Sequence, residues 1–399
     1  MHCSPLRSLV SIALLVAPVT AQTVYPTGTT IWNRESMAEG LTLFNTKDPA
    51  NQAVMVSLGG EVVLRWNAPG EGHLVGSTPL PNGNILTRSG QRVMELDRLS
   101  HIVWSYNVPP QYRPHHELLR LDNGNTLILV NQNIVASHIS PIPILDDGLL
   151  EVDPQGQIVW TWWTHEHFDE LQLSAQALGF IFVTGGDWAH TNAATPLPAN
   201  RHADPAFRAG NILLSQRSPN NVFIIDRTTG QVVWTMGLAT EGQHHVQMIG
   251  YDLPGGGNIL LFDNGAATPY RPGGRGWSRV VEVDPITERI VWQYDASRSG
   301  QYHYTFHSAL LSGCQRLANG HTLICSGITG RIFEVLPNGR IAWEYLNPFV
   351  GPVRVGGALR TAQVYRAYRV SDDFLPRGAA AKPATGLASG GGSRTPSPR

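Results

Sequence analysis

The chain has 399 residues and a formal net charge of −1, and only 15% of its residues are charged. This balance argues against nucleic acid or an anionic membrane surface as the main partner. With 41 glycines and 28 prolines between many short apolar runs, the chain is too rich in turn formers for a helical protein and indicates an all-β fold.

The first 21 residues have the pattern of a secretory signal peptide. Arg7 supplies a positive charge, an apolar run follows over residues 9–19, and small residues end at Ala21. Because the run is too short to cross a bilayer, we expect cleavage before Gln22 and a secreted or periplasmic product without stable membrane insertion. Retention of the segment as a membrane anchor is the alternative.

A closing strand that ends in tryptophan recurs along the chain. Most copies follow a strand that ends in an acidic residue and a turn, as in Glu151-Val152-Asp153. Repeats of about 40–50 residues with four short strands and periodic Trp and Gly signals are typical of a β-propeller. The copies predict six blades, each a four-stranded antiparallel sheet. Their tryptophans are Trp66, Trp104, Trp160, Trp234, Trp292 and Trp343.

A second series of residues marks the turn between the first two strands of a blade. Asn-Gly suits this position because a tight hairpin needs positive φ. The first blade has no such turn, since the chain enters it at its second strand, Gly40–Phe44. Its missing inner strand is expected within residues 359–370, where it would close the ring by pairing the two ends of the chain. The turn glycines of the other five blades are Gly83, Gly124, Gly210, Gly257 and Gly320.

These signals divide the chain after the signal peptide (1–21) into a lead-in segment, 22–39, the propeller, 40–372, and a tail, 373–399. The tail is rich in Gly, Ala, Ser and Pro and has no apolar period, so we expect it to be disordered. Two insertions interrupt the blades: residues 164–177, where we expect a short helix, and the Pro-rich residues 196–208, which we expect near the functional face.

Two cysteines remain after removal of the signal, Cys314 and Cys325, on either side of the turn at Gly320. A two-residue loop would place them opposite each other, and a three-residue loop would place them on opposite faces of the sheet. An oxidising compartment permits a disulfide, so the sequence leaves both a bond and two buried thiols open.

Histidine stands at the head of the inner strand in blades two to six. The inner strands of a propeller line its central channel, so their starts converge on one mouth. This repetition favours a functional cluster over scattered structural histidines, while His73 also fits a structural role between blades. The histidines are His73, His115, His116, His190, His244, His245 and His307.

The residue types around these histidines limit the chemistry. Imidazoles accompanied by Arg271, Arg275, Arg279 and the amide of Asn192 suit an anionic substrate with several oxygen atoms. Imidazole can act both as nucleophile and as proton carrier near neutral pH. Metal binding is the alternative chemistry, but no helical His-x-x-x-His spacing supports it, and we predict neither a metal nor a cofactor.

Several motifs resemble those of the arylsulfotransferase family, and the likeness extends over about residues 40–370. The resemblance implies an exported bacterial six-bladed propeller. Such an enzyme transfers a sulfuryl group from an aryl sulfate ester to a phenol through a sulfated histidine, without a nucleotide donor. The motifs are Gly186–Asn192, Gly242–His245, Phe262–Gly265, Cys314–Gly320, Gly40–Phe44 and Val364–Arg369.

The resemblance also implies roles for individual residues. His307 is expected as the nucleophile by its order and spacing, His244 as the acid and base at the phenol oxygen, and His190 as a stabiliser of the sulfate. Either Arg271 or Arg275 is expected to bind the sulfate. The segment 306–308 also resembles a branch of the family with an aromatic residue at this position, in which case the sulfated histidine is either missing or another member of the ring of histidines. The remaining expected substrate contacts are His115, His116, His245 and Asn192.

Two other functions compete with sulfuryl transfer. Residues 226–234 fit the Asp-x-x-Thr-Gly-x-x-x-Trp repeat of quinoprotein dehydrogenases, but this copy stands alone and no adjacent cysteine pair is present. A non-catalytic exported propeller that binds a ligand or a protein is the other alternative. The expected partners are therefore small aryl sulfates and phenols, and homodimer formation is left open.

Overall fold

Strands in this protein are short and are buried on both faces, because successive side chains of one strand pack against two different neighbouring sheets. In β18 (Ile259–Asp263), Ile259 and Leu261 pack against the preceding blade, while Leu260 and Phe262 pack against the following one. Six such interfaces, each with its own apolar core, close the sheets into a ring.

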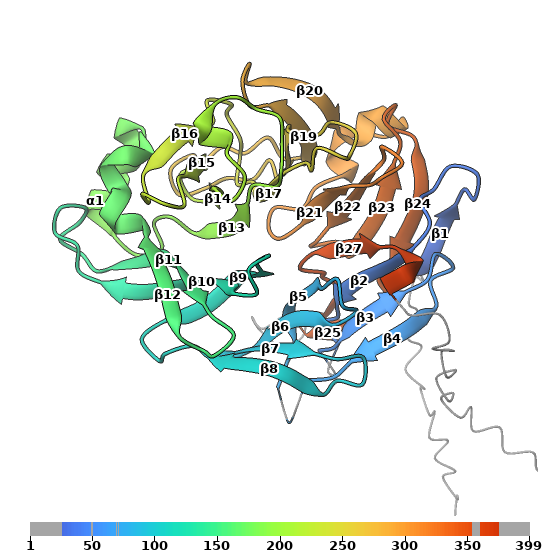
Figure 1. The fold of residues 1–399 in the computed structure, drawn as a ribbon. Coiled ribbons are helices and arrows are strands. Elements are labelled where there is room, and N and C mark those ends of the chain that lie inside the picture. The colour runs from blue at the N-terminus through green and yellow to red at the C-terminus, as the bar shows by residue number, and fades with distance from the viewer. Residues whose placement is uncertain (1–25, 49–50, 69, 71, 353–359, 375–399) are drawn as a thin grey trace, which may run out of the picture.

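The result is a six-bladed β-propeller (Figure 1), as the sequence predicts. The computed structural model describes residues 26–48, 51–68, 70, 72–352 and 360–374; the predicted signal peptide and most of the predicted tail lie outside these ranges.

Each blade runs from an inner strand at the channel to an outer strand at the rim. Blades one to three contain β27 (Ala367–Val370), β2 (Leu41–Asn45), β3 (Ala53–Val56) and β4 (Val62–Trp66); β5 (Val75–Pro79), β6 (Ile85–Ser89), β7 (Arg92–Leu96) and β8 (Ile102–Asn107); and β9 (Arg113–Arg120), β10 (Thr126–Ile134), β11 (Ile144–Val152) and β12 (Ile158–Trp163).

Blades four to six follow the same order. They contain β13 (Thr191–Pro196), β14 (Ile212–Gln216), β15 (Asn221–Ile225) and β16 (Val232–Thr235); β17 (His244–Met248), β18, β19 (Arg279–Asp284) and β20 (Arg289–Tyr294); and β21 (Gly313–Arg316), β22 (Thr322–Ser326), β23 (Arg331–Val335) and β24 (Ile341–Leu346).

The ring is closed by both ends of the chain. β27 pairs with β2 and supplies the predicted inner strand of the first blade, Val370 lying opposite Leu41. In addition, β1 (Gly28–Trp32) pairs with β24 as a fifth, outer strand of the sixth blade. Figure 1 shows these two contacts side by side, with the first strands in blue and the last in red. The segment 22–39 therefore contains a strand that the sequence pattern does not predict.

The outer strand of each blade carries a β-bulge at its start, which explains the Ile-Val-Trp pattern. In blade five, Trp292 pairs with Glu282 and Ile290 with Val283, so Val291 is the extra residue and stays exposed. Blade one departs from this register. Leu64 occupies the tryptophan position there, and Trp66 lies two residues further along the strand. Trp66 is therefore a core residue of a different kind from the other five.

Four blades carry a repeated contact to the next blade, here called the clasp. In blade five, Glu282 accepts a hydrogen bond from Asn258 at the turn and pairs with Arg316 of blade six at 2.6 Å. The Arg316 guanidinium lies over Trp292, 5.5 Å from the ring centroid, and the indole donates to the carbonyl of Pro337 in the same neighbouring blade. The other clasps join Glu95, Arg120 and Trp104; Glu151, Arg227 and Trp160; and Glu334, Arg369 and Trp343.

Helical segments lie only in the connections among the described residues. The first predicted insertion forms the 3-10 helix η1 (Thr164–Leu171) and then α1 (Ala175–Thr184), which starts near the end of the predicted range. The shorter 3-10 helices are η2 (Pro205–Phe207), η3 (Ala296–Ser299), η4 (His303–Thr305) and η5 (Asp372–Phe374), and β25 (Gly351–Pro352) pairs with β26 (Arg360–Thr361). Within the described ranges, no helix has the length and apolar character needed to cross a membrane.

The two cysteines are free, buried thiols. Leu317 pairs with His321 across a three-residue loop, so Cys314 lies opposite Ile324 while Cys325 lies opposite Gly313. Their side chains consequently pack into different cores on opposite faces of the sheet. The structure thus follows the second of the two registers that the sequence allows.

Candidate active site

Near the start of the inner strand, blades two to five each have a residue in the left-handed backbone conformation. His116, His190 and His245 have φ of 46°, 49° and 49°, and Gly76 takes the corresponding left-handed conformation in blade two. The strand register shifts at or beside each of these residues. A left-handed conformation costs a non-glycine residue about 1–2 kcal/mol, and such strain is concentrated at functional sites. This geometry marks the channel mouth as a candidate site.

Four of the predicted histidines form a continuous set, here called the histidine row: His115, His116, His190 and His244. The Nδ1 atoms of His115 and His116 are 2.7 Å apart, and the His116 and His190 rings meet edge to face with centroids 5.3 Å apart. Burial holds the pKa of His116 well below its ordinary value, and the positive charges that His115, His190 and His244 would carry lower it further. The row cannot be charged throughout, so its members differ in protonation.

His190 is the member that favours the protonated state. Its Nδ1 lies 2.5 Å from Oδ2 of Asp187, three residues earlier in the same turn. Burial lowers the pKa of His190, but the hydrogen bond and charge of Asp187, aided by Asp147, outweigh burial and raise it above its ordinary value. His190 is therefore suited to donate a proton near neutral pH.

His244 is held in one neutral tautomer. Its Nδ1 lies 2.9 Å from the carbonyl of Gly242 and 2.8 Å from Oδ1 of Asn264. The Asn264 amide nitrogen donates to two carbonyls, those of Ser308 and Leu311, which fixes its oxygen toward His244. Nδ1 of His244 must therefore carry the proton.

The opposite ring nitrogen of His244, Nε2, is the one that carries the free lone pair. Burial lowers the pKa of His244 to about 3, with further lowering by Arg217 and His190. Nε2 consequently keeps its lone pair at neutral pH. None of the hydrogen bonds or ion pairs among the described residues engages this atom, so it is available to a substrate.

Two arginines that form no ion pair among the described residues flank the histidine row, and neither was expected from the sequence. Arg217 follows β14, and its Nε is buried without a partner. Its charge lowers the pKa of both His190 and His244, and the charge of Asp187 raises the pKa of Arg217 against the larger effect of burial. Arg88 of β6 lowers the pKa of His116. A cation directly after a buried strand is a weak sequence signal, and neither residue lies in a recognisable motif. The two guanidinium groups favour an anion at the mouth.

Unsatisfied polar atoms concentrate at the same mouth. Buried polar atoms in native proteins nearly always have partners, so a group of orphans indicates a binding site or unobserved water. The side-chain atoms without a partner among the described residues include Oδ1 of Asn131, Oγ1 of Thr191, Oδ1 of Asn192, Nε of Arg217 and the hydroxyl of Tyr365.

The predicted sulfate-binding arginines are paired with carboxylates. Arg271 pairs with Glu241 at 3.2 Å, and its side chain is half exposed. Arg275 pairs with Asp263 at 3.1 Å and Glu241 at 3.6 Å, and Arg279 shares Asp263. These two carboxylates hold three arginines together at the loop between β18 and β19, so the predicted arginines already have partners within the protein.

His307 lies outside the histidine row. It follows η4, six residues before β21, and its Nε2 is buried without a partner. Burial lowers the pKa of His307, and Arg275 is the charged group that lowers it further. Its backbone neighbour Ser308 accepts from Asn264, so it is linked to His244 only through that amide. His73 is exposed and also lies outside the row.

His245 and Asn192 mainly secure the blades. Nδ1 of His245 accepts a hydrogen bond from the backbone of Cys314 in blade six, and its ring meets Tyr368 with centroids 6.0 Å apart. Asn192 donates to the carbonyl of Gln243, which joins blade four to blade five. Gln243 donates to Ser215 and to backbone carbonyls and is entirely buried. Of these, only Oδ1 of Asn192 remains free for a ligand.

A buried ion pair closes the middle of the channel. Arg366, one residue before β27, reaches both carboxylate oxygens of Glu117 in blade three at 2.8 and 2.9 Å. Tyr368 contributes its hydroxyl to the same guanidinium at 3.2 Å. The pair is almost entirely buried, and Glu117 and Tyr368 also line a cavity on the side of the channel away from the histidine row.

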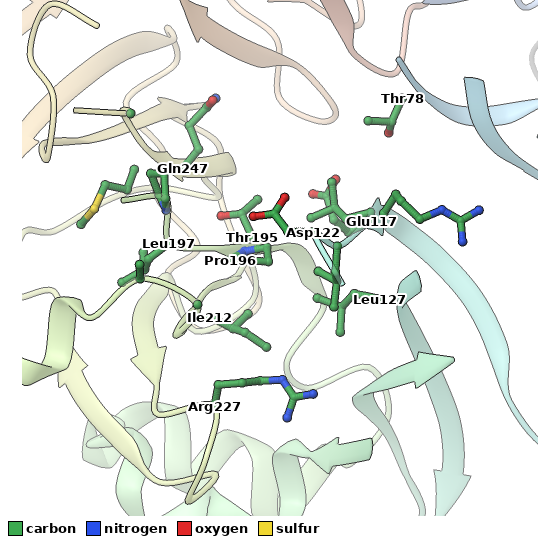
Figure 2. Close-up of a pocket in the computed structure, with 18 of the residues that line it drawn as sticks. Thr78, Glu117, Asp122, Leu127, Thr195, Pro196, Leu197, Ile212, Arg227 and Gln247 are labelled. Atoms are coloured by element: carbon green, nitrogen blue, oxygen red, sulfur yellow. The ribbon is translucent and has the colours of Figure 1, made fainter. Parts of the chain in front are cut away.

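This cavity has a volume of about 900 Å³ (Figure 2). Leu127 of blade three and Ile212 of blade four line it from facing sheets, and Arg227 stands at one end. Leu197 and Pro198 also line it, so the Pro-rich insertion 196–208 is not on the histidine face, contrary to expectation. The direction of β13 explains this placement. The strand starts at the mouth with the histidines and ends at the opposite mouth, where the insertion begins. Of the histidine pair in β17, only His245 faces this cavity.

The fold and site define a six-bladed propeller whose mouth presents histidines and unpaired arginines, an arrangement suited to an anionic substrate. A family model described as Arylsulfotransferase (ASST) matches residues 29–241, more than half of the chain, and the chain belongs to this family. The match includes His190 and Arg217 and ends just before His244.

Several solved structures are similar to this chain at low sequence identity. A protein of unknown function from Bacteroides caccae has a TM-score of 0.51 at 14% identity, covering 83% of this chain and 100% of its own. Two others have lower TM-scores. A streptogramin B lyase has a TM-score of 0.46 at 11% identity, covering 86% of this chain and 93% of its own. A virginiamycin B lyase from Staphylococcus aureus has a TM-score of 0.43 at 12% identity, covering 84% of this chain and 86% of its own. A search of curated proteins finds no significant sequence match.

Proposed function

We propose that the protein transfers a sulfuryl group from an aryl sulfate ester to a phenol, with Nε2 of His244 as the nucleophile in place of His307. The family supports a sulfotransferase of this type. The observation that carries the assignment is the fixed tautomer of His244, whose unpartnered Nε2 belongs to the same electrostatic cluster as Arg217 and His190. The expectations of export and of small phenolic partners belong to this proposal and rest on the sequence.

In the first half-reaction, the lone pair of His244 Nε2 attacks sulfur and forms the N–S bond. The S–O bond to the aryl group breaks, its electron pair leaves with the phenolate oxygen, and His190 delivers a proton to that oxygen. Arg217 binds the sulfuryl oxygens. The sulfated imidazole is cationic, and its Nδ1–H is stabilised by two acceptors, the Gly242 carbonyl and Asn264 Oδ1.

In the second half-reaction, neutral His190 takes the proton from the acceptor phenol. The resulting phenolate attacks sulfur, the N–S bond breaks, and its electron pair returns to Nε2 of His244. A weakly basic imidazole is a good leaving group, so the low pKa of His244 favours this step.

The test is covalent labelling with 4-nitrophenyl sulfate in the absence of an acceptor, read by mass spectrometry of peptides, together with steady-state transfer to phenol. We expect His244→Ala to abolish the sulfated peptide and to lower turnover at least about a thousandfold, as removal of a covalent nucleophile does in other enzymes.

The matched variant is His307→Ala, which should retain labelling. Loss of labelling in His307→Ala with retention in His244→Ala would return the nucleophile to His307. A wild-type protein that transfers no sulfuryl group from 4-nitrophenyl sulfate or 4-methylumbelliferyl sulfate would instead favour the non-catalytic propeller. The quinoprotein alternative rests on the single repeat copy at residues 226–234.

A further inference from the structure

Arg88 is an unused cation whose charge acts on His116 of the histidine row. It is the fourth residue of β6 and lies opposite Val75, directly before Gly76. Its side chain is half-buried, yet no hydrogen bond or ion pair engages it among the described residues. A guanidinium withdrawn from water without a carboxylate is costly unless something else supplies the negative charge.

The backbone of blade two brings this cation against the row. Gly76 has φ of 67°, and a Cβ there would lie 3.4 Å from the carbonyl oxygen of His116. This distance is an ordinary van der Waals contact, so β5 lies directly against the start of β9, and the positive φ is what favours glycine at position 76. Consistent with this contact, the charge of Arg88 lowers the pKa of His116.

Tyr365 supplies a further unused donor. Its ring lies 6.0 Å from the His116 ring, centroid to centroid, and its buried hydroxyl has no partner among the described residues. The neighbouring Arg366 also lies against the Tyr365 ring, at 5.2 Å, but its charge is taken up by Glu117. Of these two arginines, only Arg88 has charge left for a ligand.

We propose that Arg88, the Tyr365 hydroxyl and His116 form a second anion subsite, which binds a carboxylate on the aromatic ring of the donor. This inference rests on the proposed function. The charge of Arg217 lowers the pKa of His190 and His244, whereas that of Arg88 lowers the pKa of His116, so the two arginines act on different histidines of the row. The donor that would use both is a rigid molecule with a sulfate at one end of an aromatic ring and a carboxylate at the other. A guanidinium with a neighbouring hydroxyl suits the planar, bidentate geometry of a carboxylate.

The test compares two donors of matched shape, 4-(sulfooxy)benzoate and its methyl ester, with phenol in excess and the released aryl alcohol measured by chromatography. We expect the wild type to prefer the carboxylate in kcat/KM. Arg88→Ala should lower kcat/KM for the carboxylate donor about 10-fold to 100-fold, which is the range for a lost charge-assisted hydrogen bond. The same variant should change kcat/KM for the methyl ester by less than about twofold. Arg88→Lys should retain part of the preference.

Two further variants keep the outcome interpretable. Tyr365→Phe keeps the ring and removes only the hydroxyl, so it should lower the preference by a smaller factor, and it serves if Arg88→Ala does not fold. Arg92→Ala removes an exposed arginine of β7 that donates to Ser105, and it should leave the preference unchanged. Equal losses for both donors, or a wild type that does not distinguish them, would overturn the subsite.

Failure of the proposed function would look different. If no donor is turned over by the wild type, calorimetric binding of 4-hydroxybenzoate and of its methyl ester tests the subsite directly. Tighter binding of the carboxylate that is lost in Arg88→Ala supports the subsite without catalysis. Equal binding of the two compounds refutes it.

Discussion

At the scale of single residues, the hydrogen-bond partners of the histidines in the row determine which of them is protonated. Asp187 contacts Nδ1 of His190 and raises the pKa of that histidine above its ordinary value. Asn264 contacts Nδ1 of His244, which is buried, and fixes that histidine in a neutral tautomer. The difference arises because a carboxylate favours the charged imidazolium, whereas a neutral amide cannot offset the desolvation of a buried ring. His190 is thereby suited to donate a proton, and His244 keeps a free lone pair on Nε2 at neutral pH.

The role of Asp187 gives a prediction about pH. His190 must be protonated to release the first phenol, so this half-reaction fails as pH rises through the raised pKa of His190. Asp187→Asn removes the group that raises this pKa, and the alkaline limb should move to lower pH by about one unit or more. Single-turnover release of 4-nitrophenol across pH measures this limb. The other charges acting on His190, Asp147 and Arg217, are unchanged in the variant.

An unshifted limb in Asp187→Asn would remove His190 from the proton-donor role. Asp153→Asn, which alters a carboxylate at a blade turn remote from the row, is the control and should leave the profile unchanged.

The sequence predicts part of this site. Histidines at the heads of inner strands are visible as a repeat, and four of them do meet at one mouth. Arg271 and Arg275 are as easy to find, but their pairing with Glu241 and Asp263 depends on how one loop folds back on its own strand. Arg88 and Arg217 lie in no motif, and only the ring geometry shows that they form no ion pair among the described residues. What the sequence lacks is the pairing of charges, which is decided by tertiary contacts.

At the scale of elements, the clasp explains why the tryptophan repeat is so regular. The glutamate, arginine and tryptophan come from two blades, and each clasp joins neighbouring sheets near the end of the channel opposite the histidine row. The fold class and blade boundaries were predictable for this reason, because the repeat is local. The position of Trp66 was not, because Leu64 takes the place of the tryptophan in this blade and Trp66 pairs with Ala53, two residues further along the strand.

The clasp of blade five gives a stability prediction. Arg316→Ala leaves the carboxylate of Glu282 buried without its cation, which typically costs about 3–5 kcal/mol. The control is Arg208→Ala, which removes the more exposed partner of Asp226 and should cost less than about 1 kcal/mol. Urea unfolding followed by tryptophan fluorescence compares the two. Equal costs would show that the clasp contributes no more than a surface ion pair.

At the scale of the whole molecule, both chain ends hold the ring closed. β27 brings two buried arginines into the ring, Arg366 against Glu117 and Arg369 against Glu334. β1, in contrast, adds an outer strand whose residues stay partly exposed. Closure therefore depends mainly on the C-terminal strand, which also carries Tyr365 beside the histidine row.

Two truncations test this dependence. Removal of residues 362–399 deletes β27 and should abolish cooperative unfolding, because the first blade loses its inner strand and two carboxylates lose their cations. Removal of residues 375–399, a segment of low apolar content, should leave the thermal midpoint unchanged. Circular dichroism during heating measures both. A cooperative transition in the shorter chain would show that five complete blades suffice.

The pairing of β27 with β2 also sets the order of events during synthesis. The second strand of the first blade is made before the other five blades, and its partner only after them, so this blade cannot assemble until all the blades have been made. A chain that stops before β27 therefore has an open ring and an incomplete channel mouth. Assembly of the mouth is thus coupled to synthesis of the strand that closes the propeller, and this coupling comes from topology alone.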